Sequence, residues 1–236
     1  DWTREGTLTL PRARYLRGTG PRSLAAMSAR IVADNIGAIS EAMLDPLTTP
    51  RAVIWRIYQD LAPRGLTFHA WKLLSKLLVV PHSNTPPPTP LLHFTTTLTN
   101  PQHDLHIYTT PLTSPTSHFL ARLKIDRIAH IQPNDLLTLT DLPNLSLLDL
   151  TEAHPSSPDE SAGRVTDNLA RGWSEKPHAF PALQTLRLWG CKALSHRSLR
   201  YMAVFPTLVV YSASGPEQQW ALAAGVTRKL GWEEVD

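Results

Sequence analysis

Two stretches in the second half of the chain share one pattern of leucine and proline, and this repeat limits the folds that the chain can adopt. Residues 142–150 read LPNLSLLDL and residues 180–188 read FPALQTLRL, so both fit hydrophobic-Pro-x-Leu-x-x-Leu-x-Leu. A weaker third copy, FPTLVVY, begins at Phe205. A short helical signal precedes each copy, at residues 134–139, 165–170 and 194–202. Repetition at this scale indicates one supersecondary unit that is used several times.

The leucines of each copy predict a short strand with one apolar side. The last two leucines of Leu-x-x-Leu-x-Leu alternate with polar residues, so both point to the same face of a strand. A single strand and helix cannot bury that face, whereas stacked units bury their leucines in a continuous core and align their strands as a parallel sheet. We therefore expect Leu148, Leu186 and Tyr211 on neighbouring strands. An ordinary α/β sandwich is the alternative.

The pattern resembles the leucine-rich repeat family, in particular the longer repeats whose helix ends in Leu/Phe-Pro-x-Leu and whose strand ends near a cysteine. Trp189-Gly190-Cys191 stands at the place of that cysteine. The resemblance covers roughly residues 105–214. It implies an α/β fold, namely a short leucine-rich repeat solenoid with an N-terminal helical module. Two less regular units are expected to begin with Leu105-His106-Ile107 and with residues 125–128.

Charge and proline content divide the chain into four segments. These are a basic extended arm (1–20), a helical module (21–80), a Pro-rich linker or loop (81–101), and the repeats with a C-terminal capping helix (102–236). Five prolines between Pro81 and Pro90 predict a spacer. Six arginines against two acidic residues between Asp1 and Arg30 indicate either a solvated segment or an arm that docks on an acidic partner or a phosphate backbone.

Apolar spacing in the helical module predicts three helices. The first begins at Pro21-Arg22-Ser23, lies in a stretch without proline up to Asp45, and carries Leu24, Met27, Ile31, Val32, Ile36 and Ile39. The second has Thr49 as its cap and Pro50 as its first residue, with an apolar face of Val53, Ile54, Ile57, Tyr58 and Leu61. Thr67 caps the third, which carries Trp71, Leu74, Leu77 and Leu78. A further helix is expected over residues 220–230.

The first of these helices resembles the elongin-binding BC box of ubiquitin-ligase adaptors. In SLAAMSARIV, residues 23–32, the leucine, small-residue and aliphatic positions of that box fall on Leu24, Ser28 and Val32. The resemblance implies that the leucine enters an apolar pocket of the partner and that the small residue allows close helix approach. The alternative is that Leu24, Met27 and Ile31 pack on the other two helices.

The second helix, within residues 47–61, resembles the helix of F-box and cullin-box modules. A helical box followed by leucine-rich repeats is similar to elongin-A-like proteins and to F-box adaptors with such repeats. This order implies that Val53, Ile57 and Leu61 extend the contact with an elongin-C- or Skp-like linker protein and its cullin. The repeat strands would then present a face to a protein substrate, through Asp149, Thr151, Arg187 and Trp189.

Composition and motifs exclude several classes of function. A single cysteine, Cys191, excludes an internal disulfide and a cysteine-based zinc site. The sequence contains no Gly-x-Ser-x-Gly, phosphate-binding glycine loop or His-Glu-x-x-His. No run of about 18 apolar residues is present, so no membrane partner is expected. We expect no catalytic residues, no cofactor, no metal and no enzyme.

The predicted function is that of a non-enzymatic adaptor, the substrate-recognition subunit of a cullin-RING ubiquitin ligase. Two alternatives stay open: a structural subunit of a larger nuclear or mitochondrial complex, and nucleic-acid binding through the Arg4–Arg30 arm. The expected location is intracellular, in the nucleus or cytoplasm, with mitochondria left open.

Overall fold

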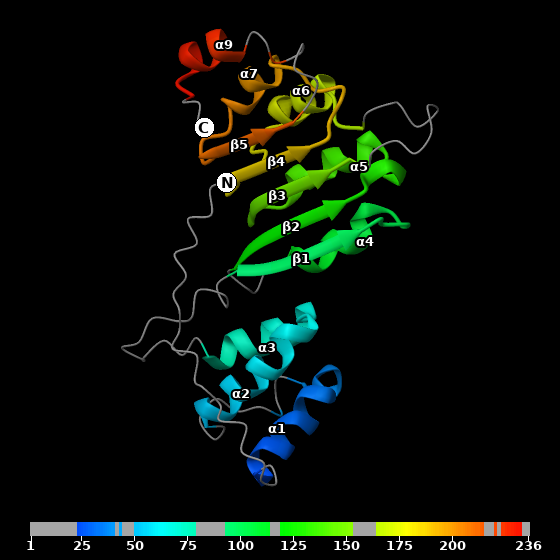
Figure 1. Ribbon diagram of the computed structural model, residues 1–236, viewed down its shortest axis with the longest axis vertical. Coiled ribbons are helices and arrows are strands. Elements are labelled where there is room, and N and C mark those ends of the chain that lie inside the picture. The colour runs from blue at the N-terminus through cyan, green and yellow to red at the C-terminus, as the bar shows by residue number, and fades with distance from the viewer. Residues whose placement is uncertain are drawn as a thin grey trace. The chain divides into compact units, whose positions relative to one another are not determined.

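The chain forms two compact units, residues 1–78 and 79–236, in a computed structural model. The structure describes residues 23–40, 43, 50–78, 93–113, 119–152, 164–214, 220 and 223–232. The first unit is helical, and the second contains a five-stranded parallel sheet with helices (Figure 1). The fold class is therefore α/β. The expected arm of residues 1–20 and the proline-rich residues 81–90 lie outside the described residues.

The helical unit is built from α1 (Leu24–Asp34), α2 (Arg51–Leu61) and α3 (Phe68–Leu78), with 3-10 turns η1 (Ile36–Ala38) and η3 (Ala62–Arg64). Ser23 caps α1, because its side chain accepts a hydrogen bond from the backbone N–H of Ala26. Thr67 caps α3 as predicted, since its Oγ1 accepts a hydrogen bond from the backbone N–H of Ala70 at 3.2 Å.

Two helix boundaries differ from the sequence expectation. The α1 helix ends at Asp34, before Ile36 and Ile39, which were expected to lie on it, because the backbone leaves the helical conformation at Asn35, with φ −110° and ψ 16°. The side chain of Asn35 then donates its Nδ2 hydrogen to the carbonyl of Ile31 at 2.8 Å. In α2, Pro50 is the capping residue and not the first helical residue; Thr49 lies outside the described residues.

The core of the helical unit comes mainly from α2 and α3. The buried apolar residues of these two helices are Ile54, Ile57, Leu61, Ala70, Trp71, Leu73, Leu74, Leu77 and Leu78. The α1 helix packs against α2, and α2 packs against α3. From α1 only two alanines, Ala29 and Ala33, are buried in this contact. The first helix is therefore attached by its small side chains.

The sheet unit follows its sequence order without a crossover. The strands are β1 (His93–Thr99), β2 (Leu120–Asp126), β3 (Leu145–Thr151), β4 (Thr185–Trp189) and β5 (Val210–Ala213), and each pairs in parallel with the next. Figure 1 shows these strands side by side in that order. The helices are α4 (Leu105–Thr109), α5 (Pro133–Leu137), α6 (Asp167–Glu175), α7 (Ser198–Met202) and α9 (Ala223–Leu230). The turns are η5 (Thr110–Leu112), η6 (Ile128–His130) and η7 (Thr138–Asp141).

Rows of apolar side chains run across the strands on one face of this sheet. One row joins Leu123, Leu148, Leu186 and Tyr211, and the next joins Ile125, Leu150, Leu188 and Ala213. The leucines and the isoleucine of both rows are fully buried. The prediction that Leu148, Leu186 and Tyr211 lie on neighbouring strands is confirmed. Each such side chain adds about 1.5–3 kcal/mol of burial free energy, so these rows form the core.

Hydrogen bonds and ring contacts also join successive parts of the sheet unit. The indole N–H of Trp173 on α6 donates to the carbonyl of Leu136 on α5 at 3.0 Å. After the proline of the repeat pattern, Asn144 Nδ2 donates to the carbonyl of Leu112 at 3.1 Å. At the corresponding position of the third copy, the hydroxyl of Thr207 donates to a carbonyl one copy earlier. In the first and third copies, the side chain after the proline therefore bonds to a carbonyl of an earlier part of the sheet unit.

The start of the sheet differs from the expectation. Residues 93–99, assigned to the linker, form β1, which pairs with β2 along its whole length. Their sequence HFTTTLT is rich in β-branched threonine, which favours a strand. The expected unit at residues 105–107 lies in helix α4 instead. The next strand begins earlier than expected and ends at Asp126, because Arg127 adopts a left-handed φ of 62°.

The C-terminal helix and the single cysteine agree with their predicted positions. The α9 helix packs beside α7, and the ring of Trp232 lies 6.3 Å from that of Tyr211 on β5. Cys191 is fully buried, and burial raises the pKa of its thiol well above the ordinary value. Because the thiolate is the reactive form, this thiol is unreactive in the folded chain.

Candidate interaction surfaces

The outer side of α1 carries the first candidate surface, formed by Leu24, Met27 and Ile31. Their exposed fractions are 76%, 46% and 64%. The spacing i, i+3, i+7 keeps the three side chains on one side of the helix, within about 60° around its axis. We call these three residues the α1 stripe. Their exposure contradicts the alternative that they pack on α2 and α3.

The three residues taken from the BC-box resemblance do not share one environment. Leu24 and Ser28 are exposed, whereas Val32 is half-buried. Steps of four residues advance by about 40° each around a helix, so Val32 lies about 80° from Leu24 and turns toward α2. The exposed set therefore consists of Leu24 and Ser28 together with Met27 and Ile31, two residues that the sequence prediction did not assign to contact.

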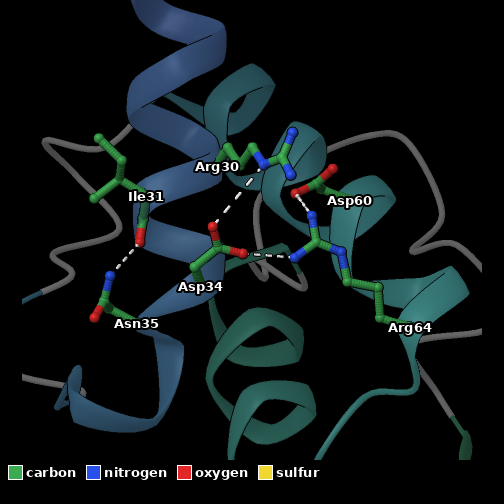
Figure 2. A network of polar contacts seen from close by, with 6 residues as sticks. All are labelled: Arg30, Ile31, Asp34, Asn35, Asp60 and Arg64. Carbon is green, nitrogen blue, oxygen red and sulfur yellow. Dashed lines mark hydrogen bonds and ion pairs between the residues drawn. The ribbon is translucent and has the colours of Figure 1, made fainter.

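A cluster of charged side chains fixes the C-terminal end of α1 on the unit (Figure 2). Arg64 of η3 places Nη1 2.6 Å from Asp34 Oδ1 and Nη2 2.6 Å from Asp60 Oδ2. Arg30 Nε lies 3.9 Å from the other oxygen of Asp34. The hydrogen bond with Asp34 raises the pKa of the Arg64 guanidinium, which is charged in any case. Arg64 thus joins α1 to α2.

Two of the three α2 residues predicted to extend the partner contact belong to the core of the unit. Ile57 and Leu61 are buried and Val53 is half-buried. They pack inside the unit because the apolar face of α2 is the face that α1 and α3 cover. This corrects the assignment of Ile57 and Leu61 as contact residues; the assignment of Val53 stays a prediction. A sequence stripe cannot distinguish a face that packs internally from a face that awaits a partner, since both have the same period.

The second candidate surface is the face of the sheet opposite to the leucine rows, which we call the outer face. The strand register places three rows on it: Thr95, Arg122, Leu147, Thr185 and Val210; then Thr97, Lys124, Asp149, Arg187 and Ser212; then Thr99, Asp126, Thr151 and Trp189. Arginine, lysine, aspartate and threonine dominate these rows. The outer face is therefore polar, in contrast to the opposite face.

Asp149 occupies the centre of the outer face. Only 8% of its surface is exposed, and it is the one buried charged residue in the part of the chain that the structure describes. Its Oδ1 is buried and accepts no hydrogen bond from the described residues. Burial raises the pKa of Asp149; Lys124 and Arg187 lower it, and Asp126 raises it further. The side chain was expected to be exposed, but it forms the floor of this surface.

The other three residues predicted for substrate contact surround Asp149. Arg187 is exposed on the neighbouring strand, Thr151 is half-buried, and Trp189 is 43% exposed. All four predicted residues therefore lie together on the outer face.

Sequence reasoning missed the basic and acidic residues that β2 adds to this surface: Arg122, Lys124 and Asp126. The signal was present in LARLKID, residues 120–126, where apolar and charged residues alternate with the period of a strand. Lys124 Nζ lies 3.5 Å from Asp126 Oδ1, along the same strand.

The remaining predictions concern the basic arm, metals and membranes. Of the six arginines of the Arg4–Arg30 segment, Arg30 alone falls within the described residues. Across those residues, no three His, Cys, Asp or Glu side chains gather into a group that could hold a metal ion. None of the helices that the structure describes has the length and apolar content needed to span a bilayer. No protein-family model, curated protein or solved structure matches the chain.

Proposed function

We propose that this chain is a non-enzymatic adaptor that joins a linker protein to a protein substrate. The α1 stripe would bind an elongin-C- or Skp-like subunit of a cullin-RING ubiquitin ligase, and the outer face of the sheet would bind the substrate. The sheet unit would then be a short leucine-rich repeat solenoid. The proposed location is the one expected from the sequence, the nucleus or the cytoplasm.

The observation that carries this proposal is the orientation of α1. A helix that served only to complete the helical unit would turn its largest apolar residues toward α2. Here two alanines face α2, and Leu24, Met27 and Ile31 face away from it. Removing apolar surface from water stabilises by roughly 25 cal/mol per Å². Binding of a partner that covers the α1 stripe is therefore favourable, because folding of the unit leaves this apolar surface in water.

Helix-in-groove recognition fits the form of this surface. An amphipathic helix that binds in an apolar groove presents anchor residues at i, i+3, i+4 and i+7. Leu24, Met27, Ser28 and Ile31 have this spacing. The small side chain of Ser28, at i+4, allows the partner to approach the helix closely. The BC-box resemblance of residues 23–32 names the class of partner, a linker protein of the elongin-C or Skp type.

Two features support the leucine-rich repeat interpretation of the sheet unit. The three copies of the hydrophobic-Pro-x-Leu pattern supply three successive strands, β3, β4 and β5. The equivalent leucines of β3 and β4 pair in register, and Tyr211 and Ala213 take those positions on β5. The helices that alternate with them also contact one another in sequence order, α5 with α6 and α6 with α7. Contacts restricted to neighbouring units are typical of solenoid proteins.

The test is direct binding of the purified full chain to a purified elongin C–elongin B pair and, separately, to a purified Skp-family linker protein. We expect the wild type to bind one of them and Leu24→Asp to lose that binding, because a buried, unpaired charge would enter an apolar groove. Ala25→Asp is the matched control, since Ala25 is exposed on α1 but lies outside the stripe. Equal binding by Leu24→Asp and wild type, or no binding of either linker by the wild type, would reject the proposal.

A further inference from the structure

The centre of the outer face contains a carboxylate, that of Asp149, which has no ion pair among the described residues and one oxygen without a hydrogen-bond donor. Asp149 lies in one row with Lys124 on β2 and Arg187 on β4, at the roughly 4.8 Å spacing of neighbouring strands. Nevertheless, no ion pair joins Asp149 to either cation among the described residues, and Lys124 is drawn toward Asp126. The buried Oδ1 of Asp149 is left as an acceptor without a donor.

Leaving a buried acceptor without a donor is costly, and a partner that supplies the donor recovers that cost. The donor must reach a carboxylate that is almost wholly covered, so the partner has to displace a long side chain that flanks it. Both neighbours permit this movement, since the side chain of Lys124 is 45% exposed and Arg187 is exposed. Charged side chains on flexible stems move aside at low cost, in contrast to packed leucines.

The flanking cations determine what kind of donor fits. A partner lysine or arginine at Asp149 would stand beside Lys124 and Arg187, and like charges placed together disfavour binding. A hydroxyl or an amide N–H can donate without that repulsion. Arg187, in turn, has no ion pair among the described residues and offers its guanidinium for a bidentate contact with a carboxylate.

Trp189 adds an apolar contact at the end of the same strand. Its side chain is 43% exposed and lies two residues from Arg187, in the row that also contains Asp126 and Thr151. Large, rigid aromatic rings such as that of tryptophan are frequent anchors in protein–protein contacts. The outer face therefore combines an acceptor, a cation and an aromatic ring within neighbouring positions of β3 and β4.

We propose that the outer face binds a protein segment that donates a hydrogen bond from a hydroxyl or amide group to Asp149 and places a carboxylate beside Arg187. This inference rests on the proposed function in one respect, since it describes what a substrate segment presents. It makes no use of the α1 stripe, so the two can fail separately.

The experiment selects short random peptides displayed on phage against the full-length chain. We expect the selected peptides to contain an acidic residue next to Ser, Thr, Asn or Gln. The tightest peptide, synthesised with a fluorescent label, is then titrated by anisotropy with the wild type and with variants. Asp149→Leu should weaken its binding about tenfold or more, because the acceptor is lost. Asp149→Asn should weaken it less, since one acceptor oxygen stays in place.

A charge exchange tests the second contact. Arg187→Glu should weaken binding of the selected peptide, and a peptide in which lysine replaces the acidic residue should recover binding to Arg187→Glu but not to the wild type. Arg171→Glu is the matched control, because Arg171 is an exposed arginine on α6, outside the outer face. It should bind the selected peptide like the wild type. Leu24→Asp should also bind it normally, even if that variant loses the linker protein.

Four outcomes would overturn the inference: no enrichment of any peptide, selection of basic peptides, equal peptide affinity of Asp149→Leu and wild type, or failure of the charge exchange. Binding of a single-stranded oligonucleotide that is lost in Arg187→Glu but retained in Asp149→Leu would overturn it as well. That result would assign the outer face to nucleic acid. Thermal unfolding of each variant shows whether a lost contact reflects a lost fold.

Discussion

The strands of the sheet unit and helix α1 of the helical unit place their large apolar side chains in opposite ways. In the sheet unit, Leu148 and Leu186 are fully buried, because strands on both sides and helices of the same unit cover them. In the helical unit, α1 buries two alanines and leaves Leu24 and Ile31 76% and 64% exposed. Leucine is thus a core residue in the sheet unit, as it is on α3, but a surface residue on α1.

This difference separates leucines that hold the chain together from leucines that remain free to bind. Scattered apolar residues on a protein surface need no explanation, whereas three of them in one helical stripe form a contiguous patch. The sheet unit completes its own core, and its outer face is polar. The helical unit completes its core with α2 and α3 and keeps the α1 stripe in contact with water.

A matched pair of leucine substitutions tests this comparison and has the largest expected effect. Leu186→Ala removes a fully buried side chain from the central rows, and we expect it to lower the free energy of unfolding by about 2–5 kcal/mol. Leu24→Ala removes the same atoms from the α1 stripe, and we expect a change within about 0.5 kcal/mol. Urea unfolding followed by circular dichroism measures both.

The two units need separate probes, because one signal from the whole chain would not show which unit a substitution destabilises. The indole of Trp173 reports on the sheet unit and that of Trp71 on the helical unit, once the other tryptophans of the chain are replaced. If Leu24→Ala destabilised the helical unit as strongly as Leu186→Ala destabilises the sheet unit, the α1 stripe would be part of a core. The proposed docking surface would then be lost.

A substitution of Asp149 is expected to have a smaller effect on the free energy of unfolding and, unlike Leu186→Ala, to raise it. Burial raises the pKa of this carboxyl above its ordinary value of 3.8, against the opposing influence of Lys124 and Arg187 and with the help of Asp126. Between 3.8 and the raised pKa, the folded chain binds more protons at this site than the unfolded chain does. The contribution of Asp149 to stability is therefore fully present at low pH and is lost as the pH rises through that interval.

Asp149→Asn removes this titration. Near neutral pH the variant should be more stable than the wild type, and the difference should shrink as the pH falls toward 3.8. Thermal unfolding of both proteins across that range measures the difference directly, and other titrating groups cancel in the comparison. A variant that is less stable than the wild type at neutral pH would show that the charge of Asp149 supports the fold.

The sequence was sufficient for the register of β3, β4 and β5 but insufficient for the edge of the sheet. Leucines at period two on a repeated motif specify both the strand and the partner strand, because a slip of one residue would turn them out of the core. Residues 93–99 have no such repeated pattern. Their threonines favour a strand but do not specify the strand with which it pairs. Their role as a strand depends on the presence of β2 beside them.

The candidate site was predictable in part for a similar reason. The alternation of residue types along β3 and β4 is enough to place Asp149, Thr151, Arg187 and Trp189 on one face. It does not show that Asp149 is nearly buried, because burial depends on the long side chains of the adjacent strands. On α1, the stripe is visible in the sequence, but which side of the helix faces α2 is decided by packing, and here the alanines face inward.

The smallest expected effect concerns the charged cluster that holds α1 on the helical unit. Arg64→Gln removes the contacts to Asp34 and Asp60 but leaves the buried alanines of α1 in place, and all three charged side chains are partly exposed. The free energy of unfolding should therefore fall only slightly, and the fall should diminish at high salt, which screens exposed charges. Arg30→Gln is the control, because Arg30 lies farther from Asp34 and contacts only its own helix.

Hydrogen exchange distinguishes local weakening of the α1 contact from destabilisation of the whole helical unit. In Arg64→Gln we expect faster exchange of the α1 backbone amides and unchanged exchange in α3, since the cluster joins Asp34 of α1 to Arg64 and Asp60 and does not include α3. Such a result would mean that α1 is the least firmly held helix of the unit, as a helix that must fit a partner's groove can be. Equal acceleration in α1 and α3 would instead show that the cluster stabilises the whole helical unit. The α1 helix would then be held as firmly as α3, despite the exposure of Leu24 and Ile31.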